Sequence, residues 1–532
     1  MQPEPFDNEL TLPTHRQRGA LDEFHAAYDE ALAAVEAELG ASHPLVIDGE
    51  RIATDQEFTV TSPAETDLEV GTFAAGTAED VDEAVDAATA AFDSWRVREP
   101  SERAAIFRRG AERMRERKFE LAATLTIENG KNRSEAMADV DEAIDFLRFY
   151  SRELERNDGY QYDTGEPTPG QRCSNGLEPI GVFGVIGPFN FPCAIFTGMV
   201  AGAALTGNAV VAKPAGATPL IAHKVVDVLS TAGVPDGVLN LITGDGRAVG
   251  TPLVEHDDVD GIAFTGSREV GDWIQRRFLE LDKRGPVIAE LGGKNPVIMT
   301  ATADLEKSVP GVAKGAFGYS GQKCSATSRV YVHEDLLKPF TRELVSAAED
   351  LPIRRPRDPE AFVSPLINDD ALERYREVCA VARRDGDILT GGSVASSPDL
   401  PDGRFVEPTV VRGIAHDHDL AREEHFLPFV TIHPVSDLEE AIEKANDSTY
   451  GLCAGLFSED PDEVDTWQER IESGMCYVNR EQSATTGALV QAQPFGGWKA
   501  SGTTGKFAGG YWYLPQFLRE QSRTVIGDLE RA

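Results

Sequence analysis

Residues 318–325 read GYSGQKCS and place Cys324 in a glycine-rich turn. Upstream of it, residues 290–296 read ELGGKNP and place Glu290 before a pair of glycines. A thiolate is a strong nucleophile, and a carboxylate can activate water or carry a proton. The two turns therefore predict covalent catalysis, in which Cys324 attacks a substrate carbon and Glu290 handles water or protons.

The most unusual bulk property of the chain is its charge. It has 532 residues, with 89 acidic and 51 basic side chains and a formal net charge of -38. An evenly acidic, solvated surface suits molar salt, which screens the repulsion between like charges. We interpret the chain as a protein of an extreme halophile, with an ordinary acidic protein as the alternative. The charge also argues against nucleic acid and anionic membranes as partners.

Length and cysteine usage limit the class of protein further. A chain of 532 residues predicts two or three domains. Its six cysteines form no C-x-x-C pair and have no histidine cluster beside them, so we expect free thiols in a reducing compartment and no metal site. The N-terminus shows no apolar signal segment, and the apolar run at residues 194–205 is too short to span a bilayer. We therefore expect a cytoplasmic protein.

Apolar periodicity predicts an α/β protein. Amphipathic helices are expected at residues 22–39, 78–92, 103–125 and 135–155. Residues 157–175 are polar and contain prolines, which indicates a hairpin-like excursion or a linker. Short apolar runs then alternate with helical segments, as in a doubly wound parallel sheet. Strands are expected at residues 46–47, 181–186, 209–213, 237–242, 261–264, 296–299, 329–332, 429–432, 476–479 and 521–525, and further helices at residues 196–205 and 220–232.

Residues 187–192 read GPFNFP. With the turns around Cys324 and Glu290, this motif resembles the aldehyde dehydrogenase superfamily, over roughly residues 45–525. The resemblance implies the aldehyde dehydrogenase fold, with a Rossmann-like cofactor domain, a catalytic α/β domain and a small β arm. It also implies that Cys324 attacks an aldehyde, that the Cys324 N–H and the Asn190 amide stabilise the oxyanion, and that Glu290 activates water against the thioester.

The cofactor motif departs from the common fingerprint. Residues 264–271 read FTGSREVG, a strand, turn and helix with the spacing G-x-x-x-x-G in place of G-x-G-x-x-G. The segment resembles the family's variant of this turn, in which the serine contacts the pyrophosphate near a helix N-terminus. The residues that we expect at the cofactor are Ile186, Lys213, Gly266, Ser267, Gly271, Glu424 and Phe426.

Two departures from the family pattern affect the prediction of which cofactor the chain binds and how its loop is shaped. The resemblance places Lys213 on the adenosine ribose and Glu424 with Phe426 on the nicotinamide side. Many family members carry a glutamate three residues after this lysine, which disfavours a 2′-phosphate, but here the residue is Gly216. We therefore expect NAD, with NADP as an alternative. Leu427 replaces a usual glycine, so the loop around it can differ in shape.

Residues 486–490 read TGALV, residues 493–497 read QPFGG, and residues 501–503 read SGT. These C-terminal segments resemble the 1-pyrroline-5-carboxylate dehydrogenases. That resemblance implies an anchor for the substrate carboxylate made of backbone N–H groups at Gly487 and Ala488, and a carboxylate, Glu142, that faces the substrate ammonium. Phe191 and Phe495 would flank the aliphatic chain, and Ser325 would supply a hydroxyl. The residues expected at the substrate are Glu142, Phe191, Lys323, Ser325, Gly487, Ala488 and Phe495.

One departure keeps alternatives open. Residues 481–485, directly before the anchor, form a segment longer than the family's pattern. The pocket could thus take another semialdehyde or an aliphatic aldehyde with the same chemistry. Two other classes are a non-catalytic relative and an esterase-like hydrolase. The presence of Cys324, Glu290 and Asn190 argues against the first, and the cofactor residues argue against the second.

The resemblance also divides the chain. We expect an NAD(P)-binding domain at residues 1–156 and 181–291, a catalytic domain at residues 292–503, and an oligomerisation arm at residues 157–180 and 504–532. The arm would pair with a second subunit, so we expect a homo-oligomer, a dimer or higher. The expected small-molecule partner is the aldehyde substrate.

Overall fold

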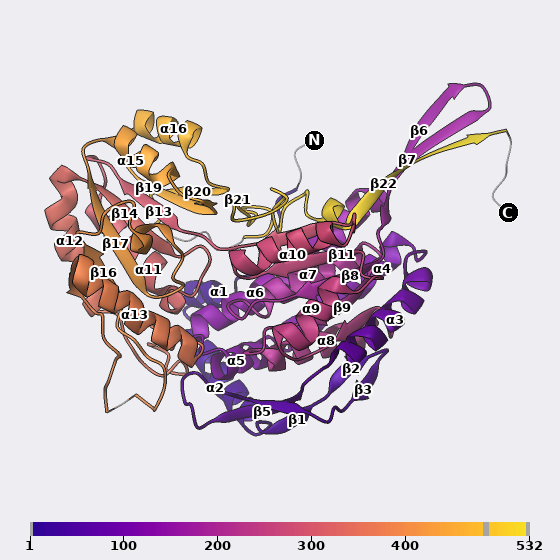
Figure 1. Ribbon diagram of the computed structural model, residues 1–532, viewed down its shortest axis with the longest axis horizontal. Helices are drawn as coiled ribbons and strands as arrows, with labels where there is room; N and C mark the ends of the chain where they lie inside the picture. Colours follow the sequence, from indigo (N-terminus) through magenta and orange to yellow (C-terminus); the bar gives the residue numbers. More distant parts are fainter. Residues whose placement is uncertain (1–3, 399, 482–488, 528–532) are drawn as a thin grey trace.

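The computed structural model describes residues 4–398, 400–481 and 489–527, and it has two lobes that face each other (Figure 1). Each lobe is built around a seven-stranded sheet. The predicted α/β class and all the predicted strands are confirmed, with bounds that differ by a few residues. Their apolar, glycine-punctuated runs become strands buried between helices, as a parallel sheet requires.

The sheet of the first lobe has five parallel strands and an antiparallel hairpin at one edge. In spatial order the strands are β12 (Val287–Glu290), β11 (Gly261–Thr265), β8 (Val182–Ile186), β9 (Ala209–Lys213), β10 (Leu239–Leu241), β2 (Leu45–Ile47) and β3 (Glu50–Ile52).

Ten helices of the described residues belong to this lobe, and their apolar faces pack with the sheet in two clusters. They are α1 (Thr11–Arg18), α2 (Leu21–Glu36), α3 (Ala78–Trp95), α4 (Pro100–Glu116), α5 (Lys118–Glu128), α6 (Arg133–Arg156), α7 (Ala194–Leu205), α8 (Pro219–Ala232), α9 (Thr251–Glu255) and α10 (Arg268–Glu280).

The prediction of one helix over residues 103–125 is wrong. The segment is split into α4 and α5 at Arg117, whose φ of -102° and ψ of 10° leave the helical region. The Arg117 guanidinium bonds Glu120 of α5 and Asp227 of α8, and these ion pairs fix the break. The apolar periodicity continues across the break, so the sequence pattern does not reveal it.

The second lobe has six parallel strands and one antiparallel edge strand. In order they are β15 (Asp387–Thr390), β16 (Thr409–Arg412), β17 (Phe429–Val435), β14 (Thr327–His333), β13 (Asn295–Met299), β19 (Cys453–Phe457) and β20 (Met475–Val478). Its helices are α11 (Leu305–Phe317), α12 (Glu334–Glu349), α13 (Asp369–Asp385), α14 (Asp419–Arg422), α15 (Leu438–Asn446) and α16 (Pro461–Arg470).

A three-stranded antiparallel arm projects from the first lobe (Figure 1). It contains β22 (Leu518–Ile526), β7 (Gln171–Pro179) and β6 (Gln161–Thr168), so the predicted hairpin at residues 157–175 is confirmed. Every residue of β6 is exposed. Two small sheets complete the strands: β1 (Ala41–His43), β5 (Glu69–Ala74) and β4 (Glu57–Thr61), and β18 (Tyr450–Gly451) with β21 (Trp498–Lys499).

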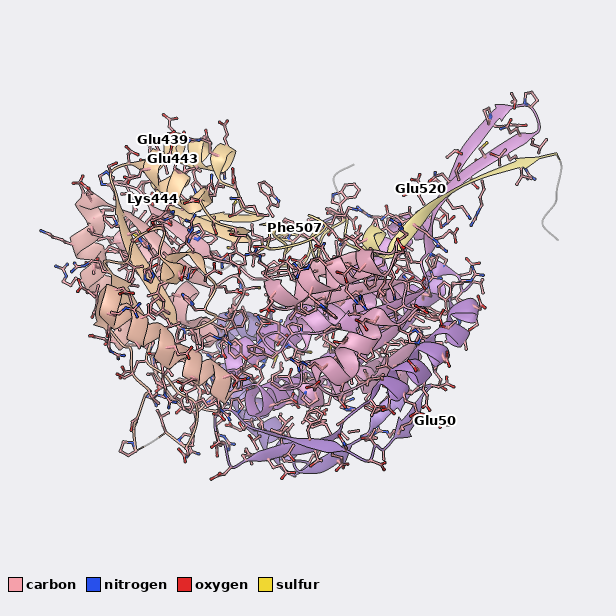
Figure 2. All side chains as sticks on the ribbon, in the orientation of Figure 1. Glu50, Glu439, Glu443, Lys444, Phe507 and Glu520 are labelled. Carbon is pink, nitrogen blue, oxygen red and sulfur yellow. The ribbon has the colours of Figure 1, made fainter. Side chains whose placement is uncertain are left out.

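Acidic side chains are distributed over distant parts of the surface. Glu439 and Glu443 lie on α15 in one lobe, Glu50 lies on β3 in the other, and Glu520 lies on the arm (Figure 2). All four are exposed. Among the described helices, none has the length and apolar character needed to cross a membrane.

Candidate active site

The turn that carries Cys324 follows α11 and has an unusual backbone. Tyr319, Ser320 and Gly321 have φ angles of 50°, 52° and 66°. Left-handed conformations are costly for residues with side chains and persist only where the surroundings hold them. A Cβ atom at Gly321 would lie 2.1 Å from the carbonyl oxygen of Leu427, so this position requires glycine.

Buried hydrogen bonds hold this turn against residues 364–367. The Gln322 side chain is fully buried; its Nε2 donates to the Pro365 carbonyl at 3.1 Å, and its Oε1 accepts from the Ile367 N–H at 2.9 Å. The Ser320 hydroxyl donates to the Ser364 carbonyl. Because buried polar bonds of this kind specify one geometry, the backbone of the turn is fixed up to Cys324.

The Cys324 thiol is half-buried near two carboxylates. Burial raises the pKa of the thiol well above its ordinary value, and the charges of Glu424 and Glu290 raise it further. The backbone N–H groups of Ser325 and of Cys324 itself favour the thiolate and act on the pKa in the opposite direction. Cys324, Glu290 and Glu424 are therefore brought together, and the charge of either carboxylate controls how readily the thiolate forms.

Glu290 ends β12, at the carboxyl edge of the parallel sheet in the first lobe. Burial raises the pKa of its carboxyl well above the ordinary value. Its Oε2 is buried and has no hydrogen-bond partner among the described residues. An orphaned carboxyl oxygen in such a place can accept a hydrogen bond from a water or a substrate group.

Asn190 lies in the loop between β8 and α7 and is 4% exposed. Within the described part of the chain, its side-chain amide forms no hydrogen bond, so its N–H groups can serve a ligand. The neighbouring Phe189 anchors the loop on two sides. Its carbonyl accepts from Asn129 Nδ2, and its ring meets Phe426 edge-on with the ring centres 5.7 Å apart.

A buried ion pair that the sequence analysis missed lies under this loop. The Lys131 ammonium is 2.8 Å from the Asp139 carboxylate, and both side chains are fully buried. Asp139 also accepts from the Ala194 N–H at the start of α7, at 2.7 Å. Lys131 lies 3.7 Å from the centre of the Phe191 ring and 5.1 Å from that of Tyr319. The pair thus joins the Asn190 loop to the Cys324 turn.

Lys213 and Ile186 end the neighbouring strands β9 and β8, at the edge where open α/β sheets bind ligands. Lys213 is 6% exposed, and its ammonium donates to the Pro214 carbonyl at 3.2 Å. Burial lowers the pKa of Lys213 to about 8. A Cβ atom at Gly216 would meet no atom within 4 Å, so the space around this position is open.

The predicted turn after β11 is confirmed as a strand, turn and helix. Ser267 is the N-cap of α10, and its Oγ accepts from the Val270 N–H at 3.4 Å. A Cβ atom at Gly266 would lie 2.5 Å from the Phe264 ring, and one at Gly271 would lie 2.4 Å from Leu291. The glycines therefore allow close packing, and the helix N-terminus beside Ser267 suits an anion.

Glu424 approaches the glycine pair that follows Glu290. Its Oε1 accepts from the Gly293 N–H at 2.9 Å, and a Cβ atom at Gly292 would lie 2.1 Å from its Oε2. Burial raises the pKa of Glu424 to about 7. Phe426 has a φ of 60°, and together with Glu424 it lines a small cavity of about 20 Å³ beside Lys323.

The predicted substrate residues lie in several environments. Glu142, on α6, is half-buried, and burial followed by the Asp139 charge raises its pKa to about 8. Lys323 is paired with Glu135 of α6 at 2.6 Å. Ser325 is 5% exposed, and Phe495 is half-buried and pairs with Ala508 in an isolated bridge. Gly487 and Ala488 lie outside the described residues, and so do residues 482–485 of the segment 481–485 before them.

The chain is similar to known proteins over nearly its whole length. The model of the aldehyde dehydrogenase family matches residues 51–522. A 1-pyrroline-5-carboxylate dehydrogenase of Bacillus subtilis (strain 168) is 38% identical over 508 residues, 94% of this chain and 95% of the relative. A crystal structure of 1-pyrroline-5-carboxylate dehydrogenase from Thermus with bound NAD is 36% identical, with a TM-score of 0.91 over 98% of this chain and 99% of that chain. The proline utilization A protein of Bdellovibrio bacteriovorus is 35% identical, with a TM-score of 0.92 over 98% of this chain and 53% of that chain.

Proposed function

This chain belongs to the aldehyde dehydrogenase family, and from that membership we propose that it is a 1-pyrroline-5-carboxylate dehydrogenase. It oxidises L-glutamate γ-semialdehyde, the open form of 1-pyrroline-5-carboxylate, to L-glutamate in proline degradation, with NAD as the cofactor. The observation that carries this proposal is the convergence of Cys324, Glu290 and Glu424, in a chain 38% identical over 94% of its length to a 1-pyrroline-5-carboxylate dehydrogenase.

The residues support a covalent route. Cys324 adds to the aldehyde carbon, and the resulting oxyanion accepts hydrogen bonds from the Asn190 amide and the Cys324 N–H. Oxidation at this carbon turns the adduct into a thioester on Cys324. Glu290, whose Oε2 has no hydrogen-bond partner among the described residues, directs water at the thioester and takes its proton. Glutamate then leaves, and the thiol is restored.

The residues at the carboxyl edge of the first sheet fit NAD. Among the described residues, the Lys213 ammonium donates only to the Pro214 carbonyl, so it is available for ribose hydroxyls. Gly266 and Ser267 offer a close-packed helix N-terminus for the pyrophosphate. Glu424 and Phe426 would hold the nicotinamide ribose and ring, with Ile186 and Gly271 shaping the site. When bound, NAD supplies the hydride acceptor for the oxidation.

Charge complementarity supports the substrate assignment. The ammonium of glutamate semialdehyde would favour the ionised form of Glu142, which burial alone disfavours, and its aliphatic chain suits the flanking rings of Phe191 and Phe495. Lys323 and Ser325 are the neighbours of the nucleophile that would complete the pocket. We assign the substrate carboxylate to the backbone N–H groups of Gly487 and Ala488. The alternative, another semialdehyde or an aliphatic aldehyde, follows from the insertion before this anchor.

The three-stranded arm supports a homo-oligomer. All residues of β6 are exposed, and an exposed sheet edge is a template for pairing with another chain. We propose that residues 157–180 and 504–532 form this oligomerisation arm. Residues 1–156 with 181–291 form the cofactor domain, and residues 292–503 form the catalytic domain.

The net charge of -38 supports adaptation to molar salt, and we propose a halophilic source. All six cysteines are free, which agrees with the reducing conditions of a cytoplasm.

A substrate comparison tests the proposed function. Oxidation of 1-pyrroline-5-carboxylate, succinate semialdehyde and a simple aliphatic aldehyde would be followed by NADH absorbance in molar KCl. We expect kcat/KM to be at least about a hundredfold higher for 1-pyrroline-5-carboxylate, because the pocket pairs with both ends of an amino acid. Turnover of the other aldehydes without this preference would keep the Cys324 chemistry and contradict the substrate assignment.

A further inference from the structure

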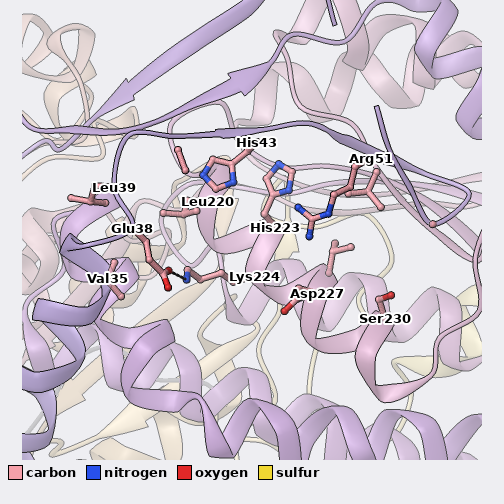
Figure 3. Close-up of a pocket in the computed structure, with 14 residues that line it drawn as sticks. Val35, Glu38, Leu39, His43, Arg51, Leu220, His223, Lys224, Asp227 and Ser230 are labelled. Carbon is pink, nitrogen blue, oxygen red and sulfur yellow. Dashed lines mark hydrogen bonds and ion pairs between the residues drawn. The ribbon is translucent and has the colours of Figure 1, made fainter. Parts of the chain in front are cut away.

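A cavity of about 600 Å³ opens far in the sequence from Cys324, between α8 and the segments around β1, β2 and β3 (Figure 3). Its wall includes Leu39, His43, Arg51, Leu220, His223 and Lys224. We call it the histidine cavity. None of its lining residues belongs to the aldehyde, cofactor or arm sites assigned above.

The two acidic lining residues are already neutralised by cationic partners. Glu38 lies 3.4 Å from the Lys224 ammonium, which also bonds Glu120 at 2.7 Å. Asp227 lies 2.7 Å from the Arg117 guanidinium. Each acidic lining residue therefore has a cationic partner, and the lining lysine already has two carboxylate partners.

Arg51 is the exception. Its guanidinium forms no ion pair with any residue that the structure describes, although the chain carries 89 acidic residues and 51 basic ones. In Figure 3 its guanidinium points toward the ring of His223. An arginine left unpaired in so acidic a chain, at the wall of a cavity, provides an open planar fork for an acidic group.

The imidazoles supply the second polar element. His43 is stacked on Phe73 at 4.8 Å between ring centres, and His43 and His223 are 5.4 Å apart. The Nε2 atom of His223 is buried and has no hydrogen-bond partner among the described residues. Burial, His43 and then Arg51 lower the pKa of His223 to about 3, so this ring is neutral at physiological pH. A neutral ring can donate from Nε2 in one tautomer.

We propose that the histidine cavity binds a small organic anion, whose acidic group pairs with Arg51 and accepts from His223 Nε2. Its apolar body lies on Leu39, Leu220 and the stacked rings. The rest of the surface repels anions, so binding depends on the local positive charge of Arg51. A carboxylate and a phosphate ester share this chemistry, and the experiment below separates them.

Calorimetric titration of the whole enzyme tests the proposal. Saturating NAD blocks the cofactor site, and ionic strength is held constant. The probes are phenyl phosphate, benzoate and inorganic phosphate. We expect at least one of the two aromatic probes to bind, and to bind at least tenfold more tightly than inorganic phosphate. Binding of phenyl phosphate alone identifies a phosphate ester as the ligand class, and binding of benzoate alone identifies a carboxylate.

Matched variants locate the site. Arg51→Gln and His223→Phe should each reduce the affinity for the probe that binds at least tenfold, while the rate of aldehyde oxidation stays unchanged. Arg284→Gln is the control, because Arg284 is an exposed arginine outside the cavity lining and its loss changes the net charge equally. Unchanged thermal unfolding midpoints verify that the variants are folded. Absence of binding for both aromatic probes, or equal weakening by Arg284→Gln, would overturn the proposal.

Discussion

The Lys131 ammonium lies 2.8 Å from the Asp139 carboxylate and 3.7 Å from the centre of the Phe191 ring, with both charged side chains fully buried. Burying two charges is expensive, and a well-packed apolar pair of similar size is often as stable. The pair is therefore better explained by the segments that it holds in place than by a contribution to stability. It connects the Asn190 loop, the start of α7 and the Cys324 turn, so we interpret Lys131 and Asp139 as positioning residues for the oxyanion donor.

Removing one partner of the Lys131–Asp139 pair should destabilise the protein, and removing both charges should recover part of the loss. Lys131→Met leaves Asp139 buried without its cation and should cost about 3–5 kcal/mol in the free energy of unfolding. The double variant Lys131→Met with Asp139→Asn removes the uncompensated charge and should recover part of that loss. Denaturant unfolding measures both values.

Kinetics separate positioning from stability. In the double variant we expect kcat to stay reduced at least about tenfold while KM for NAD is unchanged, because the Asn190 loop is no longer held. Recovery of kcat together with stability would show that the pair is only structural.

The Glu424 charge should control the reactivity of Cys324. Because burial and two carboxylates raise the pKa of the thiol, its thiolate fraction and its alkylation rate should increase as pH rises above neutrality. At pH 8 Glu424, with a pKa of about 7, is mostly ionised, so Glu424→Gln removes a negative charge and lowers the pKa of Cys324. Alkylation by iodoacetamide should accelerate about threefold or more.

Glu423, the exposed neighbour of Glu424, provides the control for the alkylation experiment. Glu423→Gln makes the same chemical change one residue away on the surface and should leave the rate within a factor of about two. Equal rates in wild type and Glu424→Gln would mean that Glu424 does not affect the nucleophile.

Gly216 should determine how strongly the enzyme prefers NAD to NADP. Open space surrounds the position, so a side chain can enter without displacing the backbone. Gly216→Glu should raise KM for NADP at least about tenfold, by repulsion of the 2′-phosphate, and change KM for NAD less. Gly216→Gln has the same shape without the charge. If it excludes NADP equally, the cause is steric and the electrostatic explanation is wrong.

Salt should stabilise the enzyme by screening its net charge of -38. The Debye length falls from about 10 Å at 0.1 M to about 3 Å at 1 M salt. We therefore expect the unfolding midpoint to rise by about 10 °C or more between 0.1 M and 2 M KCl, whereas sucrose, which screens no charge, should raise it less. The same midpoint in both KCl solutions would refute the halophilic interpretation.

The local pattern of apolar residues, glycines and capping residues was sufficient to predict most of the fold. The buried strands β8, β9 and β11 are short apolar runs, and the turn at Ser267 follows from glycine spacing and N-cap chemistry. The break at Arg117 could not be predicted, because it depends on an ion pair with Asp227, which is distant in the sequence.

The site was predictable only where a motif carries it. Cys324, Glu290 and Asn190 lie in recognisable turns, but nothing in the sequence pairs Lys131 with Asp139. Their contact arises because the chain turns between α5 and α6. The histidine cavity has the same origin, since β1 and α8 bring His43 and His223 together.

The most direct test of the account is the covalent intermediate itself. Glu290→Gln should oxidise one equivalent of 1-pyrroline-5-carboxylate per active subunit, with a burst of NADH, and then stop at the thioester. Rapid acid quench and peptide mass spectrometry should find a glutamyl adduct on Cys324, and in the wild-type enzyme the adduct should be largely hydrolysed. A burst without an adduct on Cys324, or an adduct on another cysteine, would contradict the account.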